Sequence, residues 1–379
     1  MNGKQDWLKE LEDLARSNHW GEIEQRIRKL DRKLFLSGDL IDIATMARRA
    51  YQLSFAIYLL KPLALNPDKS VNTQANPEAL AEYATCQIML GARVSAKRIL
   101  KHVPENNLKG LFAWITLYFS EAEYAKAIPY IRSYIEHTDE VYKQCIGYLN
   151  ICACYVGTGQ YELAEKEISQ LQTKLKQHNF ELLLANSQEL LGQIYIFTNR
   201  LEKAEANLKL SSKHAEDTNS LYALFVEKWK LVCGLKRGVA TDQDVQSFLV
   251  QAQKMDHYHS VRDVLLFWSM SKKDDKFKRK LFFGTPFQSY REFVQNITGQ
   301  TFNDPSCVWN GKWQNHDQGS IFYPFRTLDA EKSMSATEMS LLDALTTDLV
   351  EPKSISSLFF QLWPNEFFDP EYSVSKPYK

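Results

Sequence analysis

Apolar, aromatic and small residues recur in a fixed order along the first two thirds of the chain. Residues 145–178 place apolar side chains at helical spacing before Tyr155, a turn at Gly159 and a small residue at Ala164. Residues 185–218 repeat this order, with Tyr195 before a turn and Ala204 after it. Apolar residues three and four positions apart are typical of an amphipathic helix. Each copy therefore predicts two helices joined by a short turn.

Weaker copies of this helix-turn-helix pattern flank the two clear ones. They cover residues 4–36, 37–70, 77–107 and 108–141, and the pattern fades in 221–255. The second helices are expected to begin their contacts at Ile23, Ala56, Ala96, Ala127, Ala164 and Ala204, at intervals of 31 to 40 residues. The polar stretch 66–77 predicts an insertion between helices. A recurring unit of this length is typical of a helical repeat array.

The repeated order of turn, aromatic residue and alanine favours a mainly α fold of the solenoid type. The apolar stripes alone would also permit a plain helical bundle. In a solenoid, the first helix of each repeat lines a concave surface that binds partners. The candidate groove residues on that surface are Lys109, Phe112, Thr116, Asn186, Glu189 and Gln193. Lys109, Asn186 and Gln193 are suited to the backbone or carboxylate of an extended peptide, although a merely solvated face would have similar residues.

These residues resemble the tetratricopeptide (TPR) family. In that family a small residue lies at the contact between the two helices, an aromatic residue follows three positions later, and an alanine begins the contact of the second helix. Gly192, Tyr195 and Ala204 match this order. A larger side chain at such a contact overpacks it, at a cost of roughly 1–3 kcal/mol. The resemblance implies a TPR-like α-solenoid over residues 1–270 that binds a peptide or protein segment.

The C-terminal third has a different composition. A mixed charge run at 272–280 predicts a solvated helix or a charged linker over 271–283, although a segment that contacts an anion or nucleic acid would look similar. Aromatic segments punctuated by Gly and Pro at 281–327 predict short strands. Asn310-Gly311 between two tryptophans predicts a β-hairpin. Helices are predicted at 335–350, where Ser335 and Glu338 form a capping box, at 354–363, and from 369 onward.

This order of strands and helices resembles the winged helix-turn-helix of bacterial transcription regulators. The closest stretch runs from Ser335 to Pro364. The resemblance implies a small α+β winged-helix-like module over residues 284–379, and its DNA contacts would be Lys353, Ser354, Ser356, Ser373, Lys376 and Lys379. The module is expected to be incomplete, because the helix after 369 is followed by Pro377 and no wing. Residues 331–379 also carry eight acidic residues and four lysines, a balance that opposes binding to phosphates. The module is either cut short or degenerate.

Overall composition narrows the remaining functional classes. The 379 residues include 46 basic and 46 acidic residues, which argues against a generally nucleic-acid-binding surface. No stretch approaches the length of a membrane-spanning helix. Six cysteines lack the C-x-x-C spacing of a zinc or redox site, and they suit a reducing cytoplasm. No phosphate-binding, dinucleotide-binding, zinc-protease or nucleophile-elbow motif is present, and His257 and His259 point to different sides of a helix.

The sequence thus predicts a cytoplasmic, non-enzymatic regulatory protein with no cofactor and no metal, which binds a peptide or protein segment through the concave surface. The first alternative is a transcription regulator that binds DNA in a longer form. The second is a structural scaffold without switching. The apolar residues Phe367 and Phe368 also suggest a homodimer contact.

Overall fold

The computed structural model describes most of the chain between residues 7 and 363. The described positions are 7, 9–11, 13–14, 20–28, 35–50, 52–68, 70–215, 221–255, 257–285, 287–302, 307–309, 313–315, 335–346 and 355–363. These residues are mainly helical. None of the helices they form combines the length and the hydrophobicity that crossing a membrane requires.

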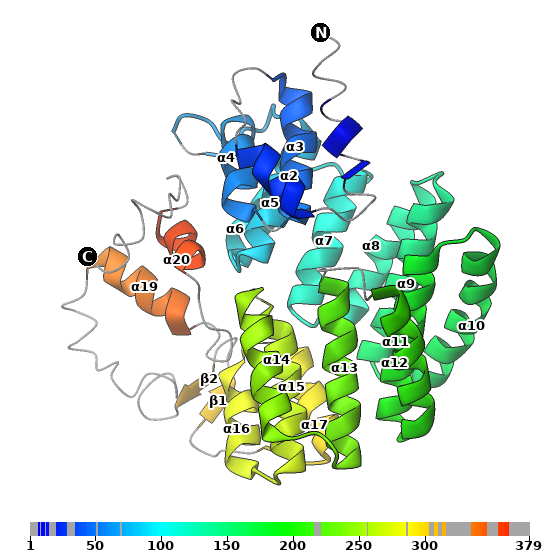
Figure 1. The fold of residues 1–379 in the computed structure, drawn as a ribbon. Coiled ribbons are helices and arrows are strands. Elements are labelled where there is room, and N and C mark those ends of the chain that lie inside the picture. Colours follow the sequence, from blue (N-terminus) through cyan, green and yellow to red (C-terminus); the bar gives the residue numbers. More distant parts are fainter. Residues whose placement is uncertain are drawn as a thin grey trace. The chain divides into compact units, whose positions relative to one another are not determined.

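The chain divides into two compact units, which Figure 1 shows with their helices labelled. Unit 1 comprises Met1–Tyr118 and Ile355–Lys379, and unit 2 comprises Phe119–Ser354. The helices of unit 1 are α2 (Trp20–Arg28), α3 (Ser37–Arg49), α4 (Leu53–Ala64), α5 (Pro77–Met89), α6 (Arg93–Leu100), α7 (Leu108–Ser120, apart from its C-terminal end) and α20 (Ile355–Leu362). This grouping differs from the predicted domains 1–270, 271–283 and 284–379.

Unit 2 contains the longest helices. They are α8 (Tyr124–Glu136), α9 (Val141–Gly157), α10 (Tyr161–Gln177), α11 (Glu181–Phe197), α12 (Leu201–Ala215), α13 (Leu221–Arg237), α14 (Asp242–Lys254), α15 (Tyr258–Ser271), α16 (Asp275–Gly284), α17 (Gln288–Thr298) and α19 (Ala336–Thr346). From α8 to α17 each helix packs against its neighbour in sequence, and α11 packs against both α9 and α13. The predicted α-solenoid therefore agrees with the packing of paired helices, whereas membership of the TPR family stays a prediction.

A residue with left-handed backbone ends many of these helices. It is Gly159 after α9, Asn199 after α11 and Gly238 after α13, with φ values of 75°, 59° and 73°. The residue that follows then donates its N–H back to the last turn, from Gln160 to the Tyr155 carbonyl at 2.8 Å and from Arg200 to the Tyr195 carbonyl at 2.7 Å. This arrangement satisfies carbonyls that a helix end leaves unpaired. Short, tight turns follow from it.

Small residues lie where paired helices meet. Ala96, Ala164 and Ala204 are fully buried, as are the other predicted alanine positions of this kind. A Cβ added at Gly192 in α11 would lie 2.7 Å from the Leu208 side chain in α12. That distance is below any ordinary carbon contact, so a side chain at this position would require Leu208 to move. We call these contacts between paired helices the seam.

Residues 275–284 and 288–298 are helical, so the prediction of strands from residue 281 was wrong for this part of the chain. The charged run lies mostly within α16 and so forms a helix, although Lys278 in this run is buried and not solvated. Arg291 of α17 donates from Nε to the Phe282 carbonyl at 3.0 Å and from Nη2 to the Thr285 carbonyl, which fixes the turn between α16 and α17. Phe282, Phe283 and Tyr290 are buried in one core that includes Leu266.

The C-terminal segment contains some predicted elements without forming the predicted module. Strands β1 (Cys307–Trp309) and β2 (Trp313–Asn315) pair antiparallel with Trp309 opposite Trp313, as the hairpin prediction required. The capping box is also present, because the Ser335 N–H donates to Glu338 Oε2 at 2.7 Å and the Glu338 N–H to Ser335 Oγ at 3.3 Å. However, α19 belongs to unit 2, whereas α20 packs Phe359 into the core of unit 1.

The small α+β winged-helix-like module predicted over 284–379 is therefore not supported. Its two described C-terminal helices belong to different units, and its first residues form helices instead of strands. The proposed DNA contacts Lys353, Ser354, Ser373, Lys376 and Lys379 lie outside the described residues, as does the helix expected after 369. Ser356 lies in α20, within unit 1.

Candidate functional site

The structure separates the six predicted groove residues into two groups. Lys109, Phe112 and Thr116 lie in α7 of unit 1, where each contacts neighbours within that unit. The Lys109 ammonium lies 3.5 Å from Glu78 Oε2 and 3.9 Å from Asp42 Oδ1. It also donates to Thr45 Oγ1 at 3.2 Å. These side chains already serve as partners for one another.

Phe112 and Thr116, the other two predicted groove residues of α7, also contact residues of unit 1. The guanidinium of Arg48, which is paired with Glu82, lies 5.6 Å from the centre of the Phe112 ring. The Thr116 hydroxyl donates to the Phe112 carbonyl at 2.8 Å, within its own helix. This face of α7 therefore packs within unit 1.

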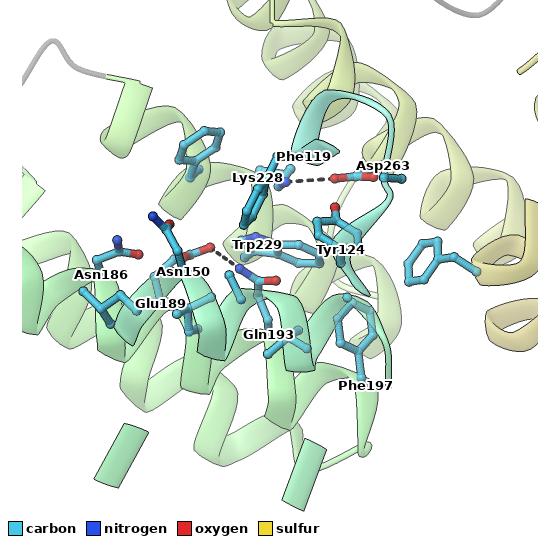
Figure 2. Close-up of a pocket in the computed structure, with 18 of the residues that line it drawn as sticks. Phe119, Tyr124, Asn150, Asn186, Glu189, Gln193, Phe197, Lys228, Trp229 and Asp263 are labelled. Atoms are coloured by element: carbon cyan, nitrogen blue, oxygen red, sulfur yellow. Dashed lines mark hydrogen bonds and ion pairs between the residues drawn. The ribbon is translucent and has the colours of Figure 1, made fainter. Parts of the chain in front are cut away.

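Asn186, Glu189 and Gln193 face a cavity of about 530 Å³ in unit 2, shown in Figure 2. They lie on one side of α11, because positions three and four apart share a helix face. The helices α9 and α13, which pack beside α11, contribute Asn150 and Trp229 to the same cavity. The helices that begin three successive pairs thus line one cavity, which has the size of a ligand pocket.

Aromatic rings form much of the cavity wall. Phe197 at the end of α11 has its ring centre 5.5 Å from Trp229 and 6.0 Å from Phe293 of α17, in edge-to-face geometry in both cases. Phe119 and Tyr124, at the turn between α7 and α8, meet edge-to-face at 5.4 Å. Such pairs hold the rings in fixed orientations. The wall is therefore apolar and presents ring faces and edges to a ligand.

One cation among the described residues lines this cavity, and it is already paired. The Lys228 ammonium of α13 lies 2.8 Å from Asp263 Oδ2 of α15 and 4.5 Å from the centre of the Trp229 ring. Lys228 is 7% exposed, so both its carboxylate partner and the ring compensate its desolvation. Its charge is consequently neutralised locally.

Glu189 is the unusual group of the site. Its side chain is 4% exposed, and Gln193 Nε2 donates to Oε1 at 2.6 Å. Within the part of the chain that the structure describes, no group donates a hydrogen bond to the second carboxylate oxygen. Burial raises the pKa of Glu189 to about 7, and the charge of Lys228 and the Gln193 hydrogen bond oppose this rise only in part. Near neutral pH this carboxyl group is divided between its acid and its anion.

A second cavity, of about 490 Å³, borders the first and shares Tyr124, Phe197 and Phe293 with it. Lys236 of α13 lines it and donates to the Ile196 carbonyl at 2.8 Å, and burial lowers the pKa of this ammonium. The hollow face of unit 2 is thus longer than the space around Glu189.

Sequence reasoning found only the α11 part of this cavity. It missed Lys228, Trp229, Asp263 and Phe293, because it treated 221–255 as a fading repeat and 281–327 as strands. The available signal was the spacing of Tyr222, Phe225 and Trp229, which places three aromatic residues on one face of α13. Asp263 could not be found from spacing alone, since it reaches Lys228 from a helix of another pair.

The described residues offer no cluster of three or more His, Cys, Asp or Glu side chains suited to a metal ion. His257 instead caps α15, accepting from the Ser260 N–H. Cys86, Cys145, Cys152, Cys154 and Cys233 are buried free thiols. Burial raises the pKa of Cys152 and Cys154 to about 12, so both remain neutral thiols.

No protein-family model matches this chain, and no curated protein matches it.

Proposed function

We propose that this protein is a cytoplasmic regulatory interaction protein that binds a peptide or protein segment in the cavity of unit 2. The observation that carries the proposal is the convergence of α9, α11 and α13 on one cavity. Repeat arrays bind extended partners along the helices that begin each repeat. The protein acts by binding and not by catalysis.

The cavity suits a side chain of the bound segment better than its whole backbone. Its volume of about 530 Å³ and its aromatic wall provide burial for an inserted group. Asn150 and Asn186 are partly buried at the same cavity, and their amides can both donate and accept. Such groups would fix the orientation of the segment beside the inserted side chain.

Binding to an array of random nine-residue peptides tests this proposal. We expect wild-type protein to bind a subset of peptides, and Asn186→Ala to weaken that binding by removing an amide from the cavity. Asn207→Ala is the matched control, because the Asn207 amide bonds to the Lys203 carbonyl on α12 and does not line the cavity. Lys109→Ala tests the α7 group in unit 1 separately.

The outcomes separate the two groups of predicted residues. Loss of binding in Asn186→Ala alone would support the cavity. Loss in Lys109→Ala alone would move the binding surface to unit 1, and no peptide binding by wild-type protein would contradict the proposal altogether.

A further inference from the structure

The cavity in unit 2 has an unbalanced set of charges. Among the residues that the structure describes, the charged side chains that line the cavity are Glu189, Lys228 and Asp263. Lys228 and Asp263 neutralise each other across 2.8 Å. Glu189 is left with a hydrogen bond from neutral Gln193. Ionised Glu189 therefore makes the cavity anionic.

We infer that the segment bound in this cavity inserts a basic side chain, lysine or arginine, whose cationic head reaches the Glu189 carboxylate while its apolar stem lies along the aromatic wall. This inference rests on the proposed function and specifies its ligand. It follows from three features that occur together, namely a largely buried carboxylate at the cavity with a hydrogen bond to one oxygen, an internally paired cation and a wall of aromatic rings.

The alternatives fit these features less well. A wholly apolar side chain would cover the second oxygen of Glu189 without a hydrogen bond, which is costly in a buried site. A carboxylate would approach Glu189 as a like charge, and Lys228, the residue that could attract it, is already paired with Asp263. A basic head would instead make charge-assisted hydrogen bonds with Glu189.

The rings add to this preference. Trp229 already lies 4.5 Å from one ammonium, that of Lys228, so the electron-rich faces of this wall accept cations. The stem of a lysine or arginine is apolar and packs well along such surfaces while its head finds a polar partner. The cationic head thus matches the Glu189 carboxylate, and the apolar stem matches the aromatic wall.

Protonation of Glu189 controls the anionic state of the site. The groups that bear on it from α13 are Lys228, whose charge is paired, and Tyr222, which stays neutral because burial raises its pKa further above its ordinary value. From α9 the cavity receives neutral Asn150, and neither α10 nor α12 lines it. A cationic ligand therefore binds most tightly above pH 7 and releases a proton when it binds near pH 7.

The test uses immobilised pools of nine-residue peptides that are random except at the fifth position. That position is lysine, arginine, norleucine or glutamate, and norleucine is close to the uncharged stem of lysine. We expect the lysine and arginine pools to retain about tenfold more wild-type protein at pH 8 than the norleucine pool. We expect this preference to shrink at pH 6, where Glu189 is protonated.

Glu189→Gln removes the charge and keeps the shape of the side chain, and we expect it to lose most of the preference. Glu162→Gln, on the exposed start of α10, is the matched control and should keep the preference. A single lysine peptide from the pool is then titrated by calorimetry at pH 7 in two buffers of different ionisation enthalpy. Proton release by wild-type protein, absent in Glu189→Gln, is the expected result.

Two results would overturn the inference and leave the proposed function standing. One is equal retention by the lysine and norleucine pools, and the other is stronger retention by the glutamate pool. Retention of wild-type protein by none of the pools would contradict the proposed function itself. A preference that survives in Glu189→Gln would also overturn the inference, because the cation would then be recognised elsewhere.

Discussion

The helices α7 and α11 each begin a helix pair, yet their polar faces have opposite surroundings. On α7, Lys109 is held by Asp42, Glu78 and Thr45 of its own unit. On α11, Glu189 has a hydrogen bond from Gln193, and both residues line a cavity. The difference indicates that a polar residue at a given place in a repeat faces open space only where the neighbouring helices leave a cavity beside it.

The seam, in contrast, is the same in both units. Ala96 of unit 1 and Ala164 of unit 2 are both fully buried where paired helices meet. Helix pairs with similar seams thus have different polar faces. A substitution in the seam therefore tests the packing of the helices, and a substitution on a polar face tests the surroundings of that face. Substitutions in the seam should give the largest effects, and a substitution on the α7 face should give the smallest.

Ala164→Phe should destabilise unit 2 by about 3 kcal/mol or more, because an aromatic ring cannot enter a filled helix contact without moving the helices. Ala96→Phe should have a similar effect on unit 1. Thermal melting followed by circular dichroism measures both. The matched controls are Leu163→Phe and Val94→Phe, at neighbouring positions that are 38% and 85% exposed. Unchanged melting temperatures of Ala164→Phe and Ala96→Phe would show that Ala164 and Ala96 are not on the seam.

The seam is also the part of the structure that the sequence predicts best. Ala164, Gly159 and Tyr155 lie close together in the sequence, and their roles follow from local helix geometry and backbone conformation. The segment 281–298 was predicted wrongly, because its aromatic residues with nearby Gly and Pro suit strands as well as a helix packed against Leu266. The cavity depends on Asp263 and Phe293 meeting α11 and α13, and such contacts between distant segments leave no local pattern.

Glu189→Gln should change how stability depends on pH. The pKa of Glu189 is about 7 in the folded protein and about 4.5 when the group is exposed. The folded state therefore binds the extra proton between these values, so the contribution of Glu189 to stability is fully present below pH 4.5 and is lost as pH rises through about 7. Above pH 7, ionised Glu189 should cost on the order of 2–3 kcal/mol. Glutamine does not ionise, so the variant should equal wild type at pH 4.5 and exceed it at pH 8.

Melting temperatures of both proteins at pH 4.5, 6 and 8 measure this difference. Glu162→Gln should follow wild type at every pH, because that exposed side chain is not part of the cavity. Parallel curves for wild type and Glu189→Gln would mean that Glu189 is solvated and that the contrast between α11 and α7 is false.

Lys109→Met should give the smallest effect, a loss of about 1 kcal/mol or less in unit 1. The lysine is 26% exposed, and its partners Asp42 and Glu78 are 65% and 50% exposed, so water weakens these ion pairs. Methionine keeps most of the stem and removes the charge. The loss should appear in thermal melting at low salt and diminish in 0.5 M salt, since salt screens exposed charges. Lys101→Met, at the exposed end of α6, should show no comparable loss. A loss for Lys109→Met that is large and independent of salt would instead place Lys109 in a buried network, and the α7 face would then be even more firmly closed to a ligand than its distances indicate.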